Sequence, residues 1–181
     1  MTAVSQDDSA LQCASEGIQN DRDVVLAVVS QDGYMLQYAS DELKGGKCIV
    51  LVAVTQYGIA LKYASEEMRG DRDVVSATVS HNGYSYSSFK YASEGIKNDR
   101  EIILTAVSQN GRALQYASEG MQKTTHKDTV LAAVVTHDGS ALEYASDELK
   151  GDREIVLAAV TQNGWALEYA SEELKDDKEV V

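Results

Sequence analysis

The sequence predicts an all-α protein, a right-handed-type α-solenoid of about seven 25-residue two-helix repeats. Two observations predict this fold: a tripeptide that recurs at fixed spacing, and apolar runs with helix-capping residues at their ends. The tripeptide Tyr-Ala-Ser begins at Tyr38, Tyr63, Tyr91, Tyr116, Tyr144 and Tyr169, and a seventh copy begins with cysteine at Cys13. Successive spacings of 25, 25, 28, 25, 28 and 25 residues indicate a period of 25 with two three-residue insertions.

The first half of each repeat is predicted to be a helix, as residues 99–111 (DREIILTAVSQNG) illustrate. Asn98 or Asp99 precedes the apolar run, and Glu101 lies three residues after Asn98, which is the spacing of a capping box. Gly111 follows the run and is expected to end the helix with a positive φ. The same position is held by Gly33, Gly58, Gly83, Gly139 and Gly164.

The second half, residues 113–121 (ALQYASEGM), is predicted to be a second helix. Leu114, Ala117 and Met121 recur at intervals of three and four residues, which places them on one helical face. In the first half, alanines are expected to let neighbouring helices approach closely. They are Ala27, Ala53, Ala77, Ala106, Ala133 and Ala159.

A strand is the alternative for the valine-rich half. Residues 24–29 (VVLAVV) are mostly β-branched, and a strand plus a helix in 25 residues would resemble a leucine-rich repeat. That repeat needs leucines two and three apart and an Asn ladder, which are missing. The equivalent run 156–160 (VLAAV) is rich in alanine, so helix is the favoured interpretation.

Residues 1–181 are predicted to form a single helical-repeat array in which both terminal repeats are incomplete. Helices of about ten residues are marginally stable in water, so each must be stabilised by packing on the repeats before and after it.

Composition excludes several classes of function. The chain has 181 residues, 44% of them hydrophobic and 25% charged, and a net charge of −13. So negative a surface disfavours nucleic acid and anionic lipid as partners and suits a basic protein. We expect neither a membrane-inserted segment nor a signal peptide. The two cysteines, Cys13 and Cys48, are interpreted as reduced thiols, which indicates an intracellular location, cytoplasmic or organellar.

The segments YASDELKGDREIVLAAV, from Tyr144, and YASEELKDDKEVV, from Tyr169, resemble a widespread tandem repeat family. Its units are of the type ALxYASEELKxDREVVLAAVxQNG, and it is known only as a domain of unknown function. It occurs in proteins of single-celled algae and other protists and of intracellular bacteria. The resemblance implies helical repeats and an intracellular setting, but no activity, cofactor or catalytic residue.

No set of residues indicates catalysis, so the chain is predicted not to be an enzyme and to have no catalytic residues, metal site or cofactor. His81 and His137 occupy a position otherwise held by glutamine, and they lie two repeats apart, too far to share a metal ion. Acidic pairs recur at the same place in four repeats, which is typical of a solvated ridge. They are Asp41-Glu42, Glu66-Glu67, Asp147-Glu148 and Glu172-Glu173. The serines lack the glycine-rich elbow of a nucleophile.

One position varies within an otherwise constant repeat, the residue after the helix-ending glycine. It reads Ser9, Tyr34, Ile59, Tyr84, Arg112, Ser140 and Trp165. Tyr, Trp and Arg are favoured anchors of protein interfaces, so Tyr34, Ile59, Tyr84, Arg112 and Trp165 are predicted to bind a partner. Unconstrained solvent exposure is the alternative, and the sequence leaves it open.

The two insertions are the other candidates. Residues 84–89 (YSYSSF) cluster three aromatics beside Ser76, which replaces a leucine, so Tyr84, Tyr86 and Phe89 are predicted to contact a partner. Residues 123–127 (KTTHK) are basic, but we interpret them as an insertion without a role in binding.

The function predicted from these features is that of a protein–protein interaction scaffold. Its partner would be a protein, basic or part of a large complex. The alternative is a structural or peripheral subunit that braces a larger assembly, for example an algal photosynthetic antenna complex.

Overall fold

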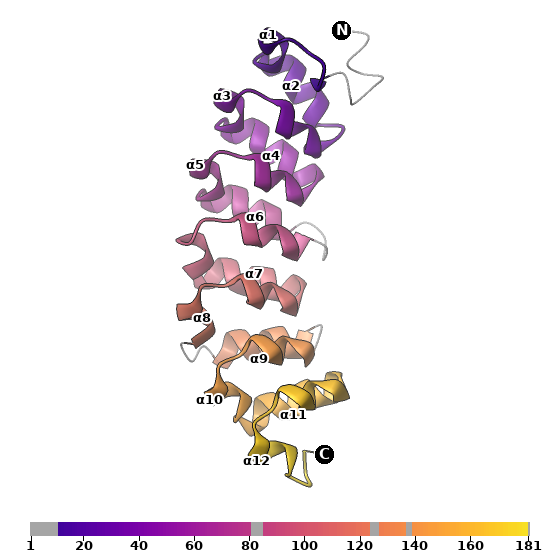
Figure 1. Ribbon diagram of the computed structural model, residues 1–181, viewed down its shortest axis with the longest axis vertical. Helices are drawn as coiled ribbons and strands as arrows, with labels where there is room; N and C mark the ends of the chain where they lie inside the picture. The colour runs from indigo at the N-terminus through magenta and orange to yellow at the C-terminus, as the bar shows by residue number, and fades with distance from the viewer. Residues whose placement is uncertain (1–10, 81–84, 124–126, 137–138, 181) are drawn as a thin grey trace. The chain divides into compact units, whose positions relative to one another are not determined.

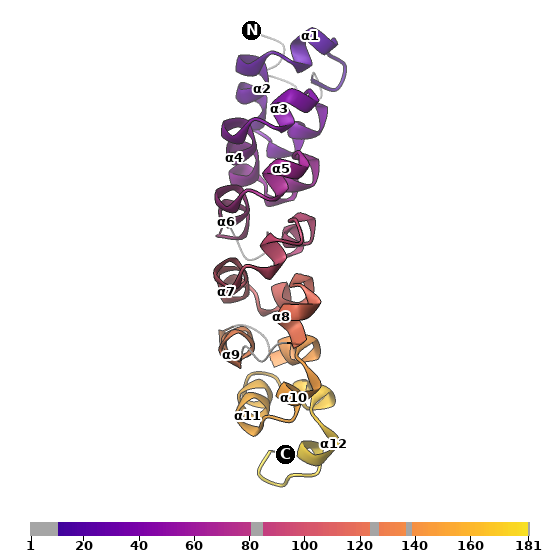
Figure 2. The same ribbon diagram turned by 90° about the vertical axis from the view of Figure 1, so that its left-hand side faces the viewer.

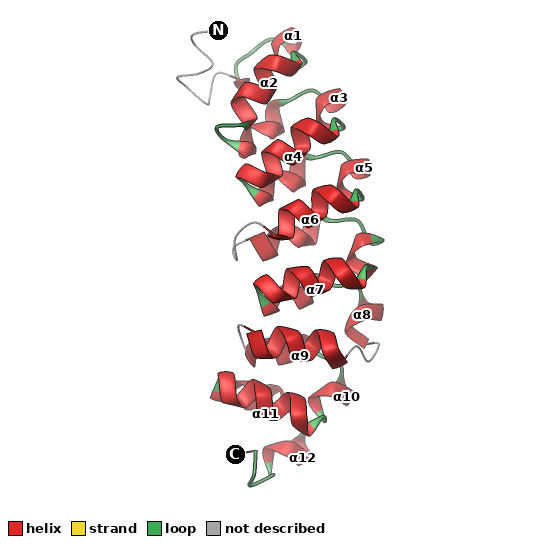
Figure 3. Ribbon diagram, turned by 180° about the vertical axis from the view of Figure 1, so that it is seen from behind, coloured by secondary structure: helices red, strands yellow, loops and turns green. Residues whose placement is uncertain are grey.

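A computed structural model describes residues 11–80, 85–123, 127–136 and 139–180. These residues form helices joined by short turns, and none of them lies in a strand (Figure 3). The contacts of the chain divide it into two compact units, Met1–Ile96 and Lys97–Val181. The prediction of helix for the valine-rich half is therefore confirmed, because residues 24–29 lie inside a helix.

Three kinds of helix follow one another in the first unit: short α-helices, long α-helices and 3-10 helices (Figure 1). In chain order they are α1 (Glu16–Gln19), α2 (Arg22–Val29), η2 (Gly33–Tyr38), α3 (Asp41–Lys44), α4 (Lys47–Gln56), η3 (Gly58–Tyr63), α5 (Glu66–Arg69), α6 (Arg72–Ser80) and η4 (Ser85–Tyr91). The elements labelled η are 3-10 helices. A three-residue 3-10 helix, η5 (Ile96–Asn98), spans the boundary of the units.

The second unit repeats the same order of elements. They are α7 (Arg100–Gln109), η6 (Gly111–Tyr116), α8 (Glu119–Lys123), α9 (Lys127–Thr136), η7 (Gly139–Tyr144), α10 (Asp147–Lys150), α11 (Arg153–Gln162), η8 (Gly164–Tyr169) and α12 (Glu172–Lys175). A repeat therefore consists of a long α-helix, a 3-10 helix and a short α-helix.

The expectation of two helices per repeat is wrong for the second half, which the structure splits in two. Leu114 lies in η6 and Met121 in α8, whereas Ala117 ends η6 with φ −62° and ψ 153°, an extended conformation. The serine that follows acts as an N-cap: the Ser118 hydroxyl accepts a hydrogen bond from the Met121 N–H at 3.3 Å. Serine favours such caps over helix interiors, which explains the break.

The long helices α2, α6, α7 and α11 begin after an aspartate, whereas α4 follows Gly46 and has no side-chain cap. Asp99 accepts hydrogen bonds from the backbone N–H groups of Glu101 and Ile102 and is the N-cap of α7. Asn98 instead accepts the hydroxyl of Ser118 at 2.9 Å. The capping-box assignment to Asn98 is therefore wrong, and the cap is the Asp99 alternative. Asp21 and Asp152 cap α2 and α11 in the same way.

Within each unit, successive long helices pack against one another, and each also packs against the 3-10 helix that follows it. In the first unit α4 contacts α2, α6, η2 and η3, and in the second unit α9 contacts α7, α11, η6 and η7. Figure 2 shows the long helices of each unit on one side and the short α-helices on the other.

The core is formed by the faces of the long helices that point toward the 3-10 helices. On α4 this face consists of Ile49, Val50, Ala53 and Val54, all buried. The 3-10 helices η2, η3, η4, η6 and η7 each add one large buried side chain at the same position, two residues before the repeated tyrosine. These are Leu36, Leu61, Phe89, Leu114 and Leu142, and all are fully buried. In η8 the residue at this position, Leu167, is only half-buried.

Gly33, Gly111 and Gly139, at the start of their 3-10 helices, serve a close backbone contact. The expected positive φ is wrong for these three and for Gly164, which has nothing within 4 Å of an added Cβ. A Cβ built on Gly111 would lie 2.5 Å from the carbonyl oxygen of Ala133 in the next long helix. On Gly33 or Gly139 it would come closer still, to the carbonyl oxygens of Ala53 and Ala159. The position admits only hydrogen, because a methyl group needs more than 3 Å.

The prediction that alanines allow close approach of neighbouring helices is confirmed in part. Ala53, Ala106, Ala133 and Ala159 are buried at equivalent positions. Ala27 and Ala77 instead lie one position earlier in their helices, and Ala27 is exposed. The contact position in those helices is held by Val28 and Thr78, both buried.

Neighbouring repeats are also joined through their backbones. In five of the Tyr-Ala-Ser tripeptides, the backbone N–H of the serine donates a hydrogen bond to a carbonyl at the end of the short helix of the preceding repeat. The bonds run from Ser40 to Gln19, Ser65 to Lys44, Ser93 to Arg69, Ser118 to Lys97 and Ser171 to Lys150, at 2.9–3.0 Å.

Candidate binding surface

The variable position falls at the first turn of the 3-10 helices, directly after the repeat glycine, which is buried in η2, η3, η6 and η7 and exposed in η8. In the first unit Tyr34 is 37% exposed and Ile59 is half-buried. In the second unit Arg112 is exposed and Trp165 is 82% exposed, the most open large apolar side chain described. The repeat thus holds four of the predicted partner-binding residues at equivalent places, two in each unit.

The insertion at 84–89 gives a different result. Tyr84 and the side chain of Tyr86 lie outside the described residues, as do His81, His126 and His137. Phe89 is fully buried in the core position of the 3-10 helices, so its assignment as a partner-binding residue is wrong. Its place two residues before Tyr91 matches Leu36 before Tyr38, and this register identifies it as core.

Three aromatic rings meet on the surface of the first unit, and we call Tyr34, Tyr57 and Tyr63 the tyrosine cluster. The rings of Tyr34 and Tyr63 are perpendicular, with centroids 5.2 Å apart. The rings of Tyr34 and Tyr57 meet edge to face at 6.4 Å and 63°. Perpendicular pairs at these separations are favourable because the edge of one ring is positive and the face of the other negative.

The cluster has a fixed base and an open side. Burial, followed by a hydrogen bond with Tyr34, raises the pKa of Tyr63 to about 12. Tyr63 therefore stays a neutral phenol at physiological pH. Tyr57, by contrast, is 55% exposed. Tyr34 and Tyr57 are therefore the accessible rings, and Tyr34 packs against both Tyr63 and Tyr57.

A hollow of about 400 Å³ lies beside the cluster, between the ends of α2 and α4. Gln31, Asp32, Gly33, Tyr34, Gln56 and Tyr57 line it. The Asp32 carboxylate accepts a hydrogen bond from the Tyr34 N–H at 2.9 Å, which fixes its position. The hollow therefore combines two aromatic side chains, two amides and one carboxylate.

Tyr57 is the residue of this surface that the sequence analysis missed. It occupies the position before the repeat glycine, where other repeats have Asp32, Asn82, Asn110, Asp138 and Asn163. Asp32, Asn110 and Asn163 each cap their 3-10 helix with a side-chain oxygen, whereas Tyr57 makes no side-chain cap to η3. The sequence shows this difference, because a tyrosine cannot replace the capping oxygen of Asp or Asn.

A second, acidic hollow of about 670 Å³ lies between α1 and α3. Glu16, Asn20, Ser40, Asp41 and Glu42 are among its lining residues. The Ser40 hydroxyl donates to the Asn20 side-chain oxygen across it at 2.6 Å, so these groups already serve the packing of two repeats.

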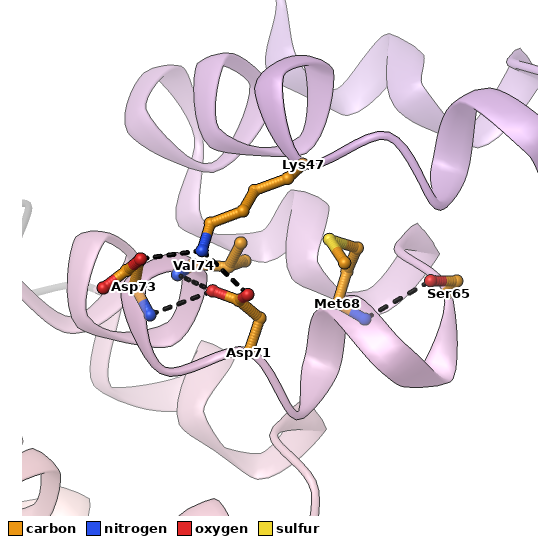
Figure 4. A network of polar contacts seen from close by, with 6 residues as sticks. All are labelled: Lys47, Ser65, Met68, Asp71, Asp73 and Val74. Carbon is orange, nitrogen blue, oxygen red and sulfur yellow. Dashed lines mark hydrogen bonds and ion pairs between the residues drawn. The ribbon is translucent and has the colours of Figure 1, made fainter.

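Ion pairs link the starts of successive long helices. Lys47 at the start of α4 contacts Asp71 at 2.9 Å and Asp73 at 2.7 Å at the start of α6 (Figure 4). In the second unit Lys127 contacts Asp152 at 2.9 Å and Glu154 at 2.7 Å. Equivalent pairs join Arg100 to Asp128, and Arg153 to Asp177 and Glu179.

These pairs shift the ionisation of their members. Hydrogen bonds with Glu154 and Asp152 raise the pKa of Lys127 to about 12. The hydrogen bond from Lys127 lowers the pKa of Asp152, against the effect of burial. Because the pattern recurs and its groups are paired with one another, we interpret it as structural.

The described residues contain no group of three or more His, Cys, Asp or Glu arranged to hold a metal ion. Among the helices that the structure describes, none is long and apolar enough to cross a membrane. Cys13 and Cys48 are both free and exposed.

No curated protein and no solved structure matches the chain. One family model, described as a domain of unknown function (DUF4116), matches four times in tandem, over residues 1–44, 47–89, 79–122 and 126–175. Each match spans about two of the 25-residue repeats. Since the matches cover most of its length, the chain belongs to the DUF4116 family of repeat domains.

Proposed function

We propose that this protein is a scaffold of helical repeats that binds a partner protein through the tyrosine cluster. The observation that supports the proposal best is Tyr57. It replaces a residue that caps a helix elsewhere in the chain, and it exposes a large aromatic ring beside Tyr34. A position that gives up stability for an exposed ring is typical of binding surfaces.

The proposal includes the architecture that carries this surface. We propose that the repeats continue as one right-handed-type α-solenoid of about seven repeats. In support, the two units show the same contacts between long helices and 3-10 helices, and the family matches run in tandem through both. Such a stack holds side chains at equivalent positions of successive repeats, which suits an extended partner.

The experiment is purification of the tagged protein from its native cells, followed by reconstitution with whichever protein co-purifies in stoichiometric amount. Affinities are then measured by calorimetry for the native chain and a Tyr34→Ala/Tyr57→Asn double variant. We expect about 10- to 100-fold weaker binding, because interface aromatics near a binding centre contribute about 1–3 kcal/mol.

A Glu67→Gln variant on the exposed side of α5 serves as the control and should bind normally. Unchanged affinity of the double variant would overturn the assignment of the surface. The absence of any stoichiometric protein partner would overturn the scaffold function itself.

A further inference from the structure

We propose that the hollow beside the tyrosine cluster binds the guanidinium group of an arginine on the partner protein. This inference rests on the proposed function and specifies the chemistry of its partner. The hollow is lined by Tyr34, Tyr57 and the carboxylate of Asp32, with the amides of Gln31 and Gln56 at its sides.

The rings supply the first attraction. The face of an aromatic ring carries partial negative charge and attracts a cation placed within about 6 Å of its centroid. Two lysine ammonium groups of the chain already lie over tyrosines in this way: Lys62 is 5.4 Å from the centroid of Tyr63, itself a member of the cluster, and Lys90 is 4.9 Å from that of Tyr91. Tyr57, at 55% exposure, offers its ring to a cation from outside.

Charge supplies the second attraction and selects against other ligands. Asp32 uses one carboxylate oxygen to cap η2, which holds the charged group in place. The chain carries a net charge of −13, so an anionic side chain would be repelled both locally and at long range. An aliphatic side chain would leave the Asp32 carboxylate desolvated without a partner, which is costly.

The shape of the site favours arginine over lysine. A guanidinium is planar, stacks on aromatic rings and has five N–H donors. It can therefore lie on a tyrosine face while donating to Asp32 and to the oxygens of Gln31 and Gln56. Tyr63 holds Tyr34 perpendicular to itself at 5.2 Å, so the site is organised before the ligand binds.

The test uses two capped peptides, acetyl-Gly-Arg-Gly-amide and its citrulline counterpart, titrated into the ¹⁵N-labelled full chain. Citrulline has the shape of arginine without its charge. We expect the arginine peptide to shift the amide signals of Gly33, Tyr34 and Tyr57, and the citrulline peptide to bind roughly three- to tenfold more weakly.

Two variants separate the ring from the charge, and both keep the fold. Tyr57→Asn removes the ring and restores the capping residue found at Asn110 and Asn163. Asp32→Asn removes the charge, while its side-chain oxygen still caps η2 as Asn110 caps η6. Each is expected to weaken the arginine peptide roughly three- to tenfold. Tyr57→Phe, which keeps the ring, should bind like the native chain.

Equal binding of the two peptides, or unchanged binding by both variants, would overturn the inference. So would signal shifts confined to the acidic hollow at Glu16 and Glu42. If a reconstituted partner is lost with Tyr57→Asn although citrulline binds as well as arginine, the scaffold function stands and only the arginine assignment fails.

Discussion

At the scale of single residues, Tyr57 and Thr129 each depart from a pattern that the other repeats keep. Tyr57 lies where a capping Asp or Asn belongs, and its 3-10 helix has no side-chain cap. Thr129 lies where other long helices have Val24, Ile49, Val74, Ile102 and Ile155. Its side chain is buried, and its hydroxyl has no hydrogen-bond partner. For both positions we expect that the residue type found in the other repeats would increase stability.

Replacing Tyr57 by Asn should stabilise the protein by about 0.5–1 kcal/mol, because the new side chain caps η3 as Asn110 caps η6. Urea unfolding measures the change. Tyr57→Ala, which loses the ring and gains no cap, is the control and should give no increase. Lower stability of the Asn variant would show that Tyr57 packs well enough to compensate for the missing cap.

Replacing Thr129 by Val should stabilise the protein by about 1–2 kcal/mol, because it removes a buried hydroxyl without a partner and keeps the side-chain shape. The matched control is Thr78→Val. Thr78 is equally buried, but its hydroxyl donates to the Val74 carbonyl at 2.8 Å, so its loss should bring no gain. Thermal unfolding of both variants decides; equal effects at the two positions would contradict the explanation.

At the scale of elements, successive repeats are joined by three kinds of contact: a glycine under a carbonyl, a backbone hydrogen bond from serine, and an ion pair at the helix starts. The glycine contact is the least tolerant, because it brings two backbones together and leaves no side chain that can move. The ion pairs are exposed and adjustable, so they contribute less.

Gly111→Ala should destabilise the protein by about 1–3 kcal/mol, because the added methyl would lie 2.5 Å from the Ala133 carbonyl oxygen. Gly164→Ala is the matched control: nothing lies within 4 Å of a Cβ there, and Ala reduces the entropy of the unfolded chain. Its stability in urea should be unchanged or slightly higher. Equal loss in the two variants would mean that backbone conformation, and not the close contact, requires glycine.

Asp152→Asn should make stability less dependent on pH. The pKa of Asp152 is lowered in the folded state, so its contribution is present above the unfolded value of 3.8 and is lost as the pH falls through the folded value. The variant keeps the cap of α11 and loses the pair with Lys127. It should be less stable than the native chain at pH 7, and the difference should shrink as the pH falls below the unfolded value of 3.8.

Urea midpoints at pH 7, 5 and 2.5 give this measurement. Glu148→Gln on the exposed side of α10 is the control and should keep the native pH profile. A difference between Asp152→Asn and the native chain that stays the same from pH 7 to pH 2.5 would assign the loss to the cap and not to the ion pair.

At the scale of the whole molecule, the proposed solenoid leads to an expectation about size in solution. Seven repeats, each about one helix diameter thick, would form a rod of roughly 60–70 Å. A compact globule of this length would have a radius of gyration of about 16 Å. Small-angle scattering of the monomer should therefore give a value above about 20 Å; a value near 16 Å would contradict the stacked array.

Periodicity alone identified the repeat length, the long helices and the position that varies on a constant framework. These are properties of local sequence, because capping residues and apolar runs act within one turn or one helix. Phe89 was wrongly predicted to contact a partner, although its register with Leu36 was a local signal that marks it as core.

Only the tertiary structure decided the rest. Glycine suits both a positive φ and a close contact, and the sequence cannot separate the two; the carbonyl of the following repeat does. The tyrosine cluster likewise joins Tyr34 to Tyr57 and Tyr63 of the next repeat, so its rings meet only when two repeats pack. Contacts between repeats depend on distances that no spacing along the chain encodes, and the proposed binding surface is made of such contacts.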